Sequence, residues 1–110
     1  MNNKRQHPRF PCEIPARWQT LDSGSASGPS LVRDLSEGGM RFRSNAFIAV
    51  RRHLKIKLEL PGLESLEAAV EPVWVKNLPG VGQYEVGARF LTLSDAERAV
   101  LSGFISAAGR

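Results

Sequence analysis

The sequence of 110 residues predicts a mainly β domain, a small antiparallel barrel of about six strands followed by one amphipathic helix at the C-terminus. Two observations lead to this prediction. Apolar and polar residues alternate in several short stretches bounded by Gly and Pro, as in half-buried strands. The last stretch instead repeats its apolar residues at helical spacing. A chain of this length has room for one core, and closing the sheet removes edges that it could not otherwise cover.

The first expected strand covers residues 12–19. Its even-numbered residues from Cys12 to Trp18 are apolar and alternate with polar residues or proline. Pro15 has no N–H to donate to a ladder, which places this strand at an edge or at an opening of the barrel. We interpret Cys12 as a buried small hydrophobic residue rather than a reactive thiol.

A loop and two short strands follow. Residues 22–30 are small, polar and rich in Gly and Pro, which predicts a flexible surface loop. We expect strands at 31–34 and 40–43. The connection between these two strands runs from Asp34 to Gly39.

Two strong strand signals lie in the second half of the chain. Residues 54–60 alternate strictly and stop at the Pro61-Gly62 turn signal. Residues 84–90 alternate again after a turn rich in Gly and Pro. Each pattern predicts a strand with one face in the core.

The stretch 66–75 changes parity within one strand. Its apolar residues keep one parity up to Val70, and Val73 begins the other parity. Since a single extra residue flips the faces of a strand, we predict a bulge near Glu71-Pro72. The bulge turns Trp74 to the face opposite the start of the strand.

The C-terminal stretch predicts a helix over residues 94–108. Ser94 and Glu97 have the spacing of a capping box, in which each side chain bonds the backbone N–H of the other residue. Apolar residues then recur at helical spacing up to Ala108, and Gly109 is placed to end the helix. We expect the apolar face of this helix to pack on the strands.

The charge of the chain is uneven. Its formal net charge is +4, from 15 Lys and Arg against 11 Asp and Glu. Residues 1–57 carry 11 basic and 4 acidic side chains, a net charge of +7, whereas residues 58–110 carry 4 basic and 7 acidic ones, a net charge of −3. An anionic partner is therefore expected at the first half of the chain.

From the sequence we expect neither a membrane protein nor a protein with a disulfide, metal or cofactor. No apolar run has the roughly 18 to 20 residues that span a bilayer, and the polar start lacks a signal-peptide core, so we expect a cytoplasmic protein with no membrane insertion. Cys12 is the only cysteine, and His7 and His53 are the only histidines, so we expect no disulfide, metal or cofactor.

Catalysis is not expected either. Asp34, Ser36 and His7 supply the residue types of a hydrolase triad, but no Gly-x-Ser-x-Gly elbow surrounds Ser36, and nothing in the sequence brings His7 to it. No Walker-type phosphate loop or local carboxylate pair is present. We therefore predict a protein that is not an enzyme and has no catalytic residues.

Two motifs stand out in the basic half. Arg5-Gln-His-Pro-Arg9 is an Arg-x-x-x-Arg, and a chain this rich in arginine contains roughly one such pair by chance. The segment from Asp34 through Ser36 to Gly39 is an Asp-x-Ser-x-x-Gly, for which chance gives on the order of 0.02 to 0.03 matches. By itself the second motif also fits an ordinary hairpin connection.

In this order and at this separation, the two motifs resemble the signature of the PilZ domain family, bacterial receptors for the second messenger cyclic di-GMP. Gly87-Ala-Arg-Phe90 matches the family's Gly-x-x-Phe on the last strand, and the resemblance covers nearly the whole chain. It implies a six-stranded antiparallel β-barrel with a C-terminal helix over residues 12–110. Residues 1–11 would be a mobile basic arm that ligand orders against the barrel rim.

The resemblance implies that Arg5, Arg9, Asp34, Ser36 and Gly39 bind cyclic di-GMP. An arginine fork can pair with a phosphate or with O6 and N7 of guanine, and its flat face can stack on a purine. A carboxylate such as that of Asp34 accepts from the Watson–Crick donors of guanine, which adenine does not present. Ser36 could add a hydroxyl contact, and Gly39 suits a sharp turn or a close approach of the ligand.

Two further positions belong to this expected site. Gly38 can share the task of its glycine neighbour. Lys4 stands where many family members have another arginine, so it keeps the charge but loses the planar fork. The resemblance implies that a basic residue here favours two bound ligands. We assign Arg41 and Arg43, like the arginines at 51 and 52, to outward-facing positions rather than to ligand contacts.

Two alternatives remain open at this point. One is a small basic barrel that binds single-stranded nucleic acid, which usually needs exposed aromatic residues on a basic face. The aromatic residues here mostly follow strand patterns that look inward, Trp74 among them, so nucleic acid is disfavoured. The other is an adaptor of the same fold that binds protein without nucleotide, against which the intact motifs argue. In the favoured reading the chain is a monomer or ligand-dependent dimer that relays its signal to an unidentified effector protein.

Overall fold

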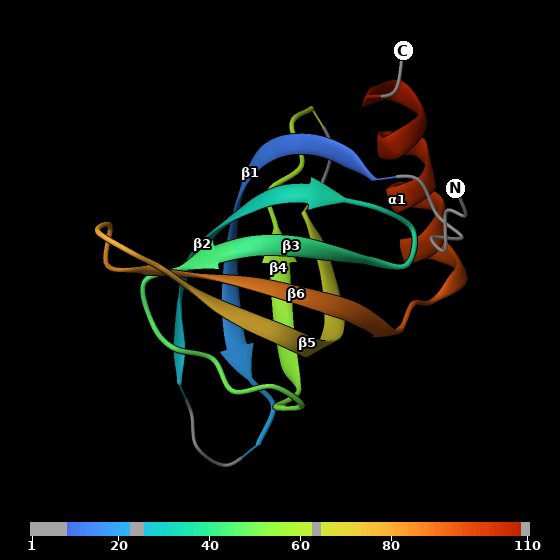
Figure 1. Ribbon diagram of the computed structural model, residues 1–110. Coiled ribbons are helices and arrows are strands. Elements are labelled where there is room, and N and C mark those ends of the chain that lie inside the picture. The colour runs from blue at the N-terminus through green and yellow to red at the C-terminus, as the bar shows by residue number, and fades with distance from the viewer. Residues whose placement is uncertain (1–8, 23–25, 63–64, 109–110) are drawn as a thin grey trace, which may run out of the picture.

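The computed structural model describes residues 9–22, 26–62 and 65–108 as a closed barrel of six antiparallel strands with one helix beside it (Figure 1). Around the barrel the strands follow the order β1-β2-β3-β6-β5-β4. The prediction of a six-stranded antiparallel barrel with a C-terminal helix is confirmed. The elements are β1 Phe10–Thr20, β2 Ser27–Leu35, β3 Gly39–Ser44, β4 Leu54–Leu58, β5 Leu66–Leu78, β6 Gln83–Thr92 and α1 Asp95–Ala108.

Buried residues that alternate with exposed ones along several strands fill the barrel. In β4, Leu54, Ile56 and Leu58 are buried, whereas Lys55 and Lys57 face solvent. The same parity operates in β1, β3 and the first half of β5, so their apolar side chains meet in a single core. The largest fully buried side chains include Ile14, Leu35, Met40, Phe42 and Leu101.

Strand β1 extends beyond its ladder with β4. It pairs with β2 along most of its length, but its ladder with β4 starts only at Ala16. Pro15 thus lies where β1 leaves the β4 ladder, which confirms its predicted place at an opening. β1 begins at Phe10, inside the range 1–11 that we assigned to the arm.

The predicted loop 22–30 is wrong at its C-terminal end. Residues 27–30 form the start of β2, and Gly28 pairs with Trp18 of β1. Strand pairing here needs no apolar side chain of its own, because the Trp18 ring covers Gly28 so closely that a Cβ would approach it to 3.0 Å. Residues 23–25 of that prediction lie outside the described residues.

Strand β5 carries the predicted irregularity. Its register against β6 shifts between Ala69 and Val70 and again between Pro72 and Trp74, on either side of the predicted position. Trp74 accordingly leaves the core side and is 39% exposed, so the expected change of face is confirmed and the expectation that this tryptophan looks inward is wrong. Val73 is the extra residue of the bulge and is 50% exposed rather than turned to the core.

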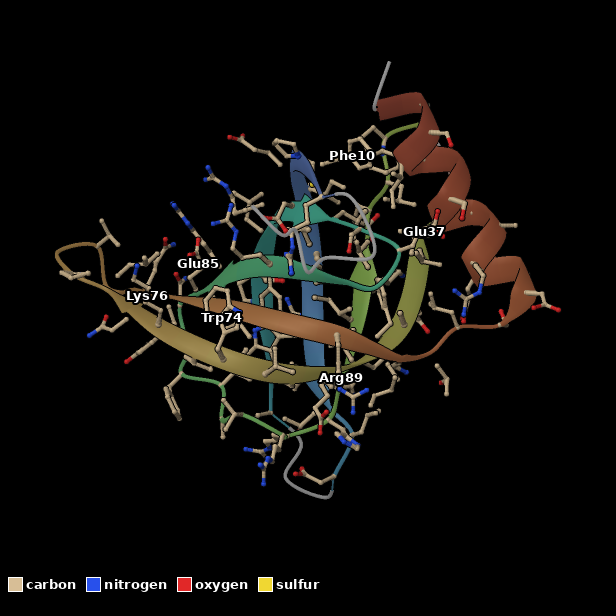
Figure 2. All side chains as sticks on the ribbon, turned by 45° about the vertical axis from the view of Figure 1, so that its right-hand side comes forward. Phe10, Glu37, Trp74, Lys76, Glu85 and Arg89 are labelled. Atoms are coloured by element: carbon tan, nitrogen blue, oxygen red, sulfur yellow. The ribbon has the colours of Figure 1, made fainter. Side chains whose placement is uncertain are left out.

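The helix begins and packs as predicted. Ser94 N donates to Glu97 Oε1 at 2.9 Å and Glu97 N donates to Ser94 Oγ at 3.1 Å, which is the capping box. Leu101 and Ile105 are buried in the core cluster, whereas Val100 is exposed, because it lies beside the apolar stripe rather than within it. Figures 1 and 2 place α1 at the end of the barrel where β2 turns into β3.

In the described part of the chain, no helix is long and apolar enough to cross a membrane.

Candidate functional site

Asp34 is the centre of a charged cluster at the end of β2. It pairs across the sheet with Pro11 of β1 and with Arg41 of β3, and only 8% of the residue is exposed. Both neighbouring ladders change register next to it, so the strands splay at this point. A carboxylate that is this buried needs partners of opposite charge.

Two arginines supply those partners. Arg9 Nη1 donates to Asp34 Oδ1 at 2.7 Å, and Arg41 Nε lies 2.9 Å from Asp34 Oδ2. Arg9 comes from the first motif and Asp34 from the second, so the fold brings the described parts of both motifs into direct contact. Arg41 belongs to neither motif.

The cluster continues along the outside of β3 and β6. Glu85, which is buried to 9% exposure, faces Arg43 in the ladder, and its Oε2 lies 3.6 Å from Arg41 Nη1 and 3.9 Å from Arg43 Nε. Two mostly buried carboxylates therefore alternate with three arginines. This arrangement fixes the Arg41 guanidinium between two acids.

A pocket of about 350 Å³ opens over this cluster. It is lined by Arg9, Pro11, Asp34, Arg41 and Trp74. The indole of Trp74 lies outside the barrel wall (Figure 2) and packs onto Gly87, where any Cβ would overlap the ring. A flat aromatic surface, two guanidinium groups and one carboxylate thus share one concave site, which suits a ligand with both anionic and planar parts.

The Asp-x-Ser-x-x-Gly turn is built around its serine. Ser36 Oγ accepts from the N–H groups of Gly38 and Gly39, each at 3.2 Å, and Ser36 N donates to the Gly39 carbonyl at 2.9 Å. Phe90 N donates to the Gly38 carbonyl at 3.0 Å. A Cβ on Gly39 would overlap the Ala88 carbonyl oxygen, so this position must be glycine for β3 to lie against β6.

The predicted residues fall into three groups. Lys4, Arg5 and His7 lie outside the described residues. Arg9 and Asp34 lie in the pocket. Ser36, together with its two glycines, shapes the turn beside the pocket.

Sequence reasoning missed three pocket residues, Pro11, Arg41 and Trp74, of which the last two bring functional groups to the site. We assigned Arg41 to an outward position without a contact, and it does point outward, but its guanidinium reaches Asp34. Counting back from the turn would have placed it opposite Asp34, since the two are cross-strand partners. Trp74 could have been found by following the predicted bulge outward instead of assigning the tryptophan to the core.

Two titratable groups have shifted pKa values. Burial, with the Asp34 charge as the second cause, raises the pKa of Cys12 from 9.0 to about 11. The thiol is half-buried against the core, which agrees with its interpretation as a hydrophobic residue. The hydrogen bond from Arg89 lowers the pKa of Glu71, and His53 adds to this effect. Glu71 thus forms ion pairs with both Arg89 and His53.

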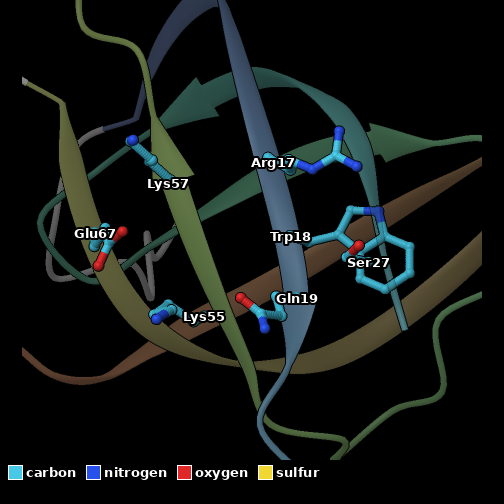
Figure 3. Close-up of a pocket in the computed structure, with 7 residues that line it drawn as sticks. All are labelled: Arg17, Trp18, Gln19, Ser27, Lys55, Lys57 and Glu67. Atoms are coloured by element: carbon cyan, nitrogen blue, oxygen red, sulfur yellow. The ribbon is translucent and has the colours of Figure 1, made fainter. Parts of the chain in front are cut away.

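A second basic pocket, of about 250 Å³, lies on the outer face of β1, β4 and β5 (Figure 3). Arg17 faces Lys57 across the β1–β4 ladder, and Lys57 faces Glu67 on its other side. Trp18 also lines this pocket but is only 4% exposed, so its ring offers no stacking surface. No motif residue takes part in it.

Within the described ranges, no group of three or more His, Cys, Asp or Glu side chains is arranged to hold a metal ion.

A closed six-stranded barrel with a C-terminal helix and a charged pocket at one end defines a small binding domain. A family model described as the PilZ domain matches residues 3–107. The chain therefore belongs to the PilZ domain family.

Solved structures agree with this assignment. The PilZ domain of YcgR from Escherichia coli with c-di-GMP has a TM-score of 0.76 and 18% identity, over 98% of this chain and 93% of that one. The Bacillus subtilis inhibitor of motility MotI/DgrA has a TM-score of 0.77 and 16% identity, over 96% of this chain and 52% of that one. The MrkH–c-di-GMP complex of K. pneumonia has a TM-score of 0.79 and 14% identity, over 96% and 52%.

The TM-scores show a shared fold. This chain spans about half the length of MotI/DgrA and MrkH. No curated protein matches the sequence.

Proposed function

We propose that this domain is a receptor that binds cyclic di-GMP in the pocket around Asp34. Its family membership supports the proposal, as do the YcgR and MrkH domains solved with c-di-GMP. The observation that carries it is the Asp34 carboxylate, held between the guanidinium groups of Arg9 and Arg41 beside the Trp74 ring. A general polyanion surface has no use for a carboxylate, whereas a guanine site does.

Binding would exchange one partner of Asp34. In the free chain, Arg9 donates to Oδ1 at 2.7 Å, the kind of acceptor that the N1–H and 2-amino groups of guanine need. A guanine that takes this place frees the Arg9 fork for a ligand phosphate or for guanine O6 and N7. Arg41 stays at Oδ2, so the carboxylate keeps a cation throughout the exchange.

The other motif residues have distinct proposed roles. Arg5 pairs with a second anionic or purine group of the ligand, and Lys4 adds charge at the same side. Ser36 and Gly39 hold the turn that positions Asp34, and Gly38 fixes it to β6. Trp74 offers its exposed face for stacking against a guanine.

Calorimetric titration with cyclic di-GMP tests the proposal, with GTP, cyclic di-AMP and a single-stranded oligonucleotide as competitors. We expect saturable heat with cyclic di-GMP that cyclic di-AMP does not compete for. The fitted stoichiometry decides between one and two ligands, and sedimentation of the same samples decides between a monomer and a ligand-dependent dimer. No heat with cyclic di-GMP would overturn the proposal.

Variants locate the site. Arg9→Ala and Asp34→Ala should each weaken binding by about 2 to 4 kcal/mol, because each leaves a ligand charge or donor unpaired. Arg41→Gln and Arg43→Gln form a matched pair on the same strand. The first should cost about 1.5 to 3 kcal/mol of binding free energy, and the second, which contacts Glu85 but does not line the pocket, less than about 0.5 kcal/mol. Equal effects of the pair would remove Arg41 from the site.

We further propose that the domain acts by binding rather than catalysis and passes its signal to a separate effector protein. The supporting observation is the Asp34 pocket, which offers charged and aromatic groups for binding. The basic pocket at Arg17 does not favour nucleic acid as a second function, since it exposes no aromatic ring.

A further inference from the structure

The end of the barrel opposite the Asp34 pocket is closed by the loop 45–53. This loop leaves β3 next to β6, passes below β6 and β5, and enters β4 (Figure 1). Ile48 in its middle is only 3% exposed and fills the barrel from below. β1 ends at the same place, where Leu21 N donates to the His53 carbonyl at 3.1 Å.

Three large apolar side chains project from this end into solvent. Phe47 is 64% exposed, Leu21 51% and Val50 49%. We call these three residues together with Arg51 the end patch. The ring of Phe47 stands edge-on against Tyr84 at a centroid distance of 5.6 Å, which holds it in a defined orientation. Single exposed apolar residues are ordinary, but three at one end of a barrel favour a contact surface there.

The backbone of the loop is held by hydrogen bonds. Gln83 Nε2 donates to Asn45 Oδ1 at 3.1 Å, and Arg51 N donates to the Pro72 carbonyl at 2.9 Å. Arg51 has a φ of 68°, in the left-handed region that a residue with a Cβ rarely adopts. Such strain persists only where the surroundings impose it. The end patch is therefore presented by a fixed backbone.

The unpaired charge around the end patch is positive. Asp22 is paired with Arg52, whose Nε lies 3.0 Å from Asp22 Oδ2, and Glu71 is paired with two cations. Arg51 and Lys55 have no ion pair among the described residues. An apolar cluster with free cations at its border matches a surface that is apolar below and anionic above.

We propose that the end patch docks on the surface of a bilayer that contains anionic lipid, with Phe47, Val50 and Leu21 in the interfacial region and Arg51 at the headgroups. A bilayer accepts side chains that project from a loop without needing a complementary pocket. Its anionic headgroups also supply partners of opposite charge for Arg51 and Lys55. The proposal does not depend on cyclic di-GMP, because the Asp34 pocket lies at the other ends of β1, β2 and β3.

Sedimentation of the full chain with vesicles tests this inference. The vesicles are made of phosphatidylcholine with or without phosphatidylglycerol. We expect binding only when phosphatidylglycerol is present and a loss of binding as salt is raised. Phe47→Ser should lower the partition coefficient about tenfold, because it removes a buried aromatic ring from the interface. Arg51→Asn should lower it about fivefold, since one cation near an anionic surface contributes about that factor.

Two controls separate the end patch from other surfaces. Val81→Ser removes an apolar side chain that is 60% exposed in the β5–β6 turn and should leave the partition coefficient unchanged. Lys4→Gln with Arg5→Gln removes charge from the first motif and should reduce binding less than Arg51→Asn does. Thermal unfolding of each variant checks that the fold is kept.

The inference is overturned by any of three results. The first is that the wild-type chain does not bind the phosphatidylglycerol vesicles, which would leave the patch to a protein partner. The second is that Phe47→Ser binds as well as wild type. The third is that the arm variant abolishes binding while the end-patch variants retain it.

Discussion

At the scale of single residues, the second motif contains one residue that lines the pocket and others that stabilise the turn beside it. Asp34 faces the pocket, whereas the Ser36 hydroxyl is used within the turn by two backbone N–H groups. Gly39 is required because β6 passes too close for a side chain. In the proposed function, only the first residue of the motif contacts the ligand, and the others hold the turn that positions it.

Gly39→Ala should destabilise the fold. Its Cβ would overlap the Ala88 carbonyl oxygen, which is backbone and cannot rotate away, so β3 and β6 must separate locally. We expect the free energy of unfolding to fall by about 1 to 3 kcal/mol in urea denaturation. Gly103→Ala is the control, because its Cβ meets nothing within 4 Å on the exposed face of α1 and should add about 0.5 to 1 kcal/mol. Equal stability of the two variants would contradict the overlap.

Cys12 gives the fold a pH dependence in the alkaline range. Its folded-state pKa is raised from 9.0 to about 11 by burial and by Asp34, so the folded chain favours the neutral thiol. The stability that this provides is complete below pH 9 and is lost as the pH rises from 9 to about 11. Denaturation midpoints of wild type should therefore fall more steeply than those of Cys12→Ala across this window. Parallel curves would show that the thiol titrates at its ordinary pKa.

At the scale of elements, the sequence predicted the strands and the helix whose own side chains indicate which face is buried or where the element begins. β4 and the core-facing half of β1 follow strict alternation, and α1 carries a complete capping box. The start of β2 was missed because its backbone pairs with β1 while the Trp18 ring supplies the apolar cover. Val73 was placed inward because parity alone does not tell which residue of a bulge is the extra one.

The candidate site was predictable to the extent that it lies in short motifs. Arg9 and Asp34 were found from spacing, although 25 positions separate them. Arg41 and Trp74 come from strands distant in sequence, and only the register of the ladders brings them to the pocket. A pocket between strands depends on register, which alternation does not determine by itself.

Ser94→Ala tests how far α1 depends on its cap. The substitution removes the acceptor of the Glu97 N–H at the first turn, leaving one of the orphan donors to water. We expect a loss of about 1 kcal/mol in the free energy of unfolding. Ser106→Ala, on the exposed side of the last turns, should change it by less than about 0.5 kcal/mol. A loss as large at residue 106 would mean that serine content rather than capping matters.

At the scale of the whole molecule, the two ends of the barrel have different proposed roles. The Asp34 pocket occupies the end where β2 turns into β3, and the end patch occupies the end where β3 turns into β4. Residues 1–57, with their net charge of +7, contribute cations to both ends. Arg9 and Arg41 lie at one end and Arg51 lies at the other. In these two proposals, the barrel binds a soluble anion at one end and an anionic surface at the other.

Hydrogen exchange tests how the chain responds to its ligand as a whole. In the proposed arm, the part that precedes Arg9 is polar, interrupted by proline and without periodicity, so we expect residues 1–8 to gain order only when an anion pairs with Lys4 and Arg5. Saturating cyclic di-GMP should slow amide exchange in this segment, while the core strand β4, which carries no residue of the proposed site, exchanges as before. GTP at the same concentration is the control and should leave the segment unchanged. Equal protection of residues 1–8 with and without cyclic di-GMP would show that the arm is already ordered and that binding adds contacts to a preformed site.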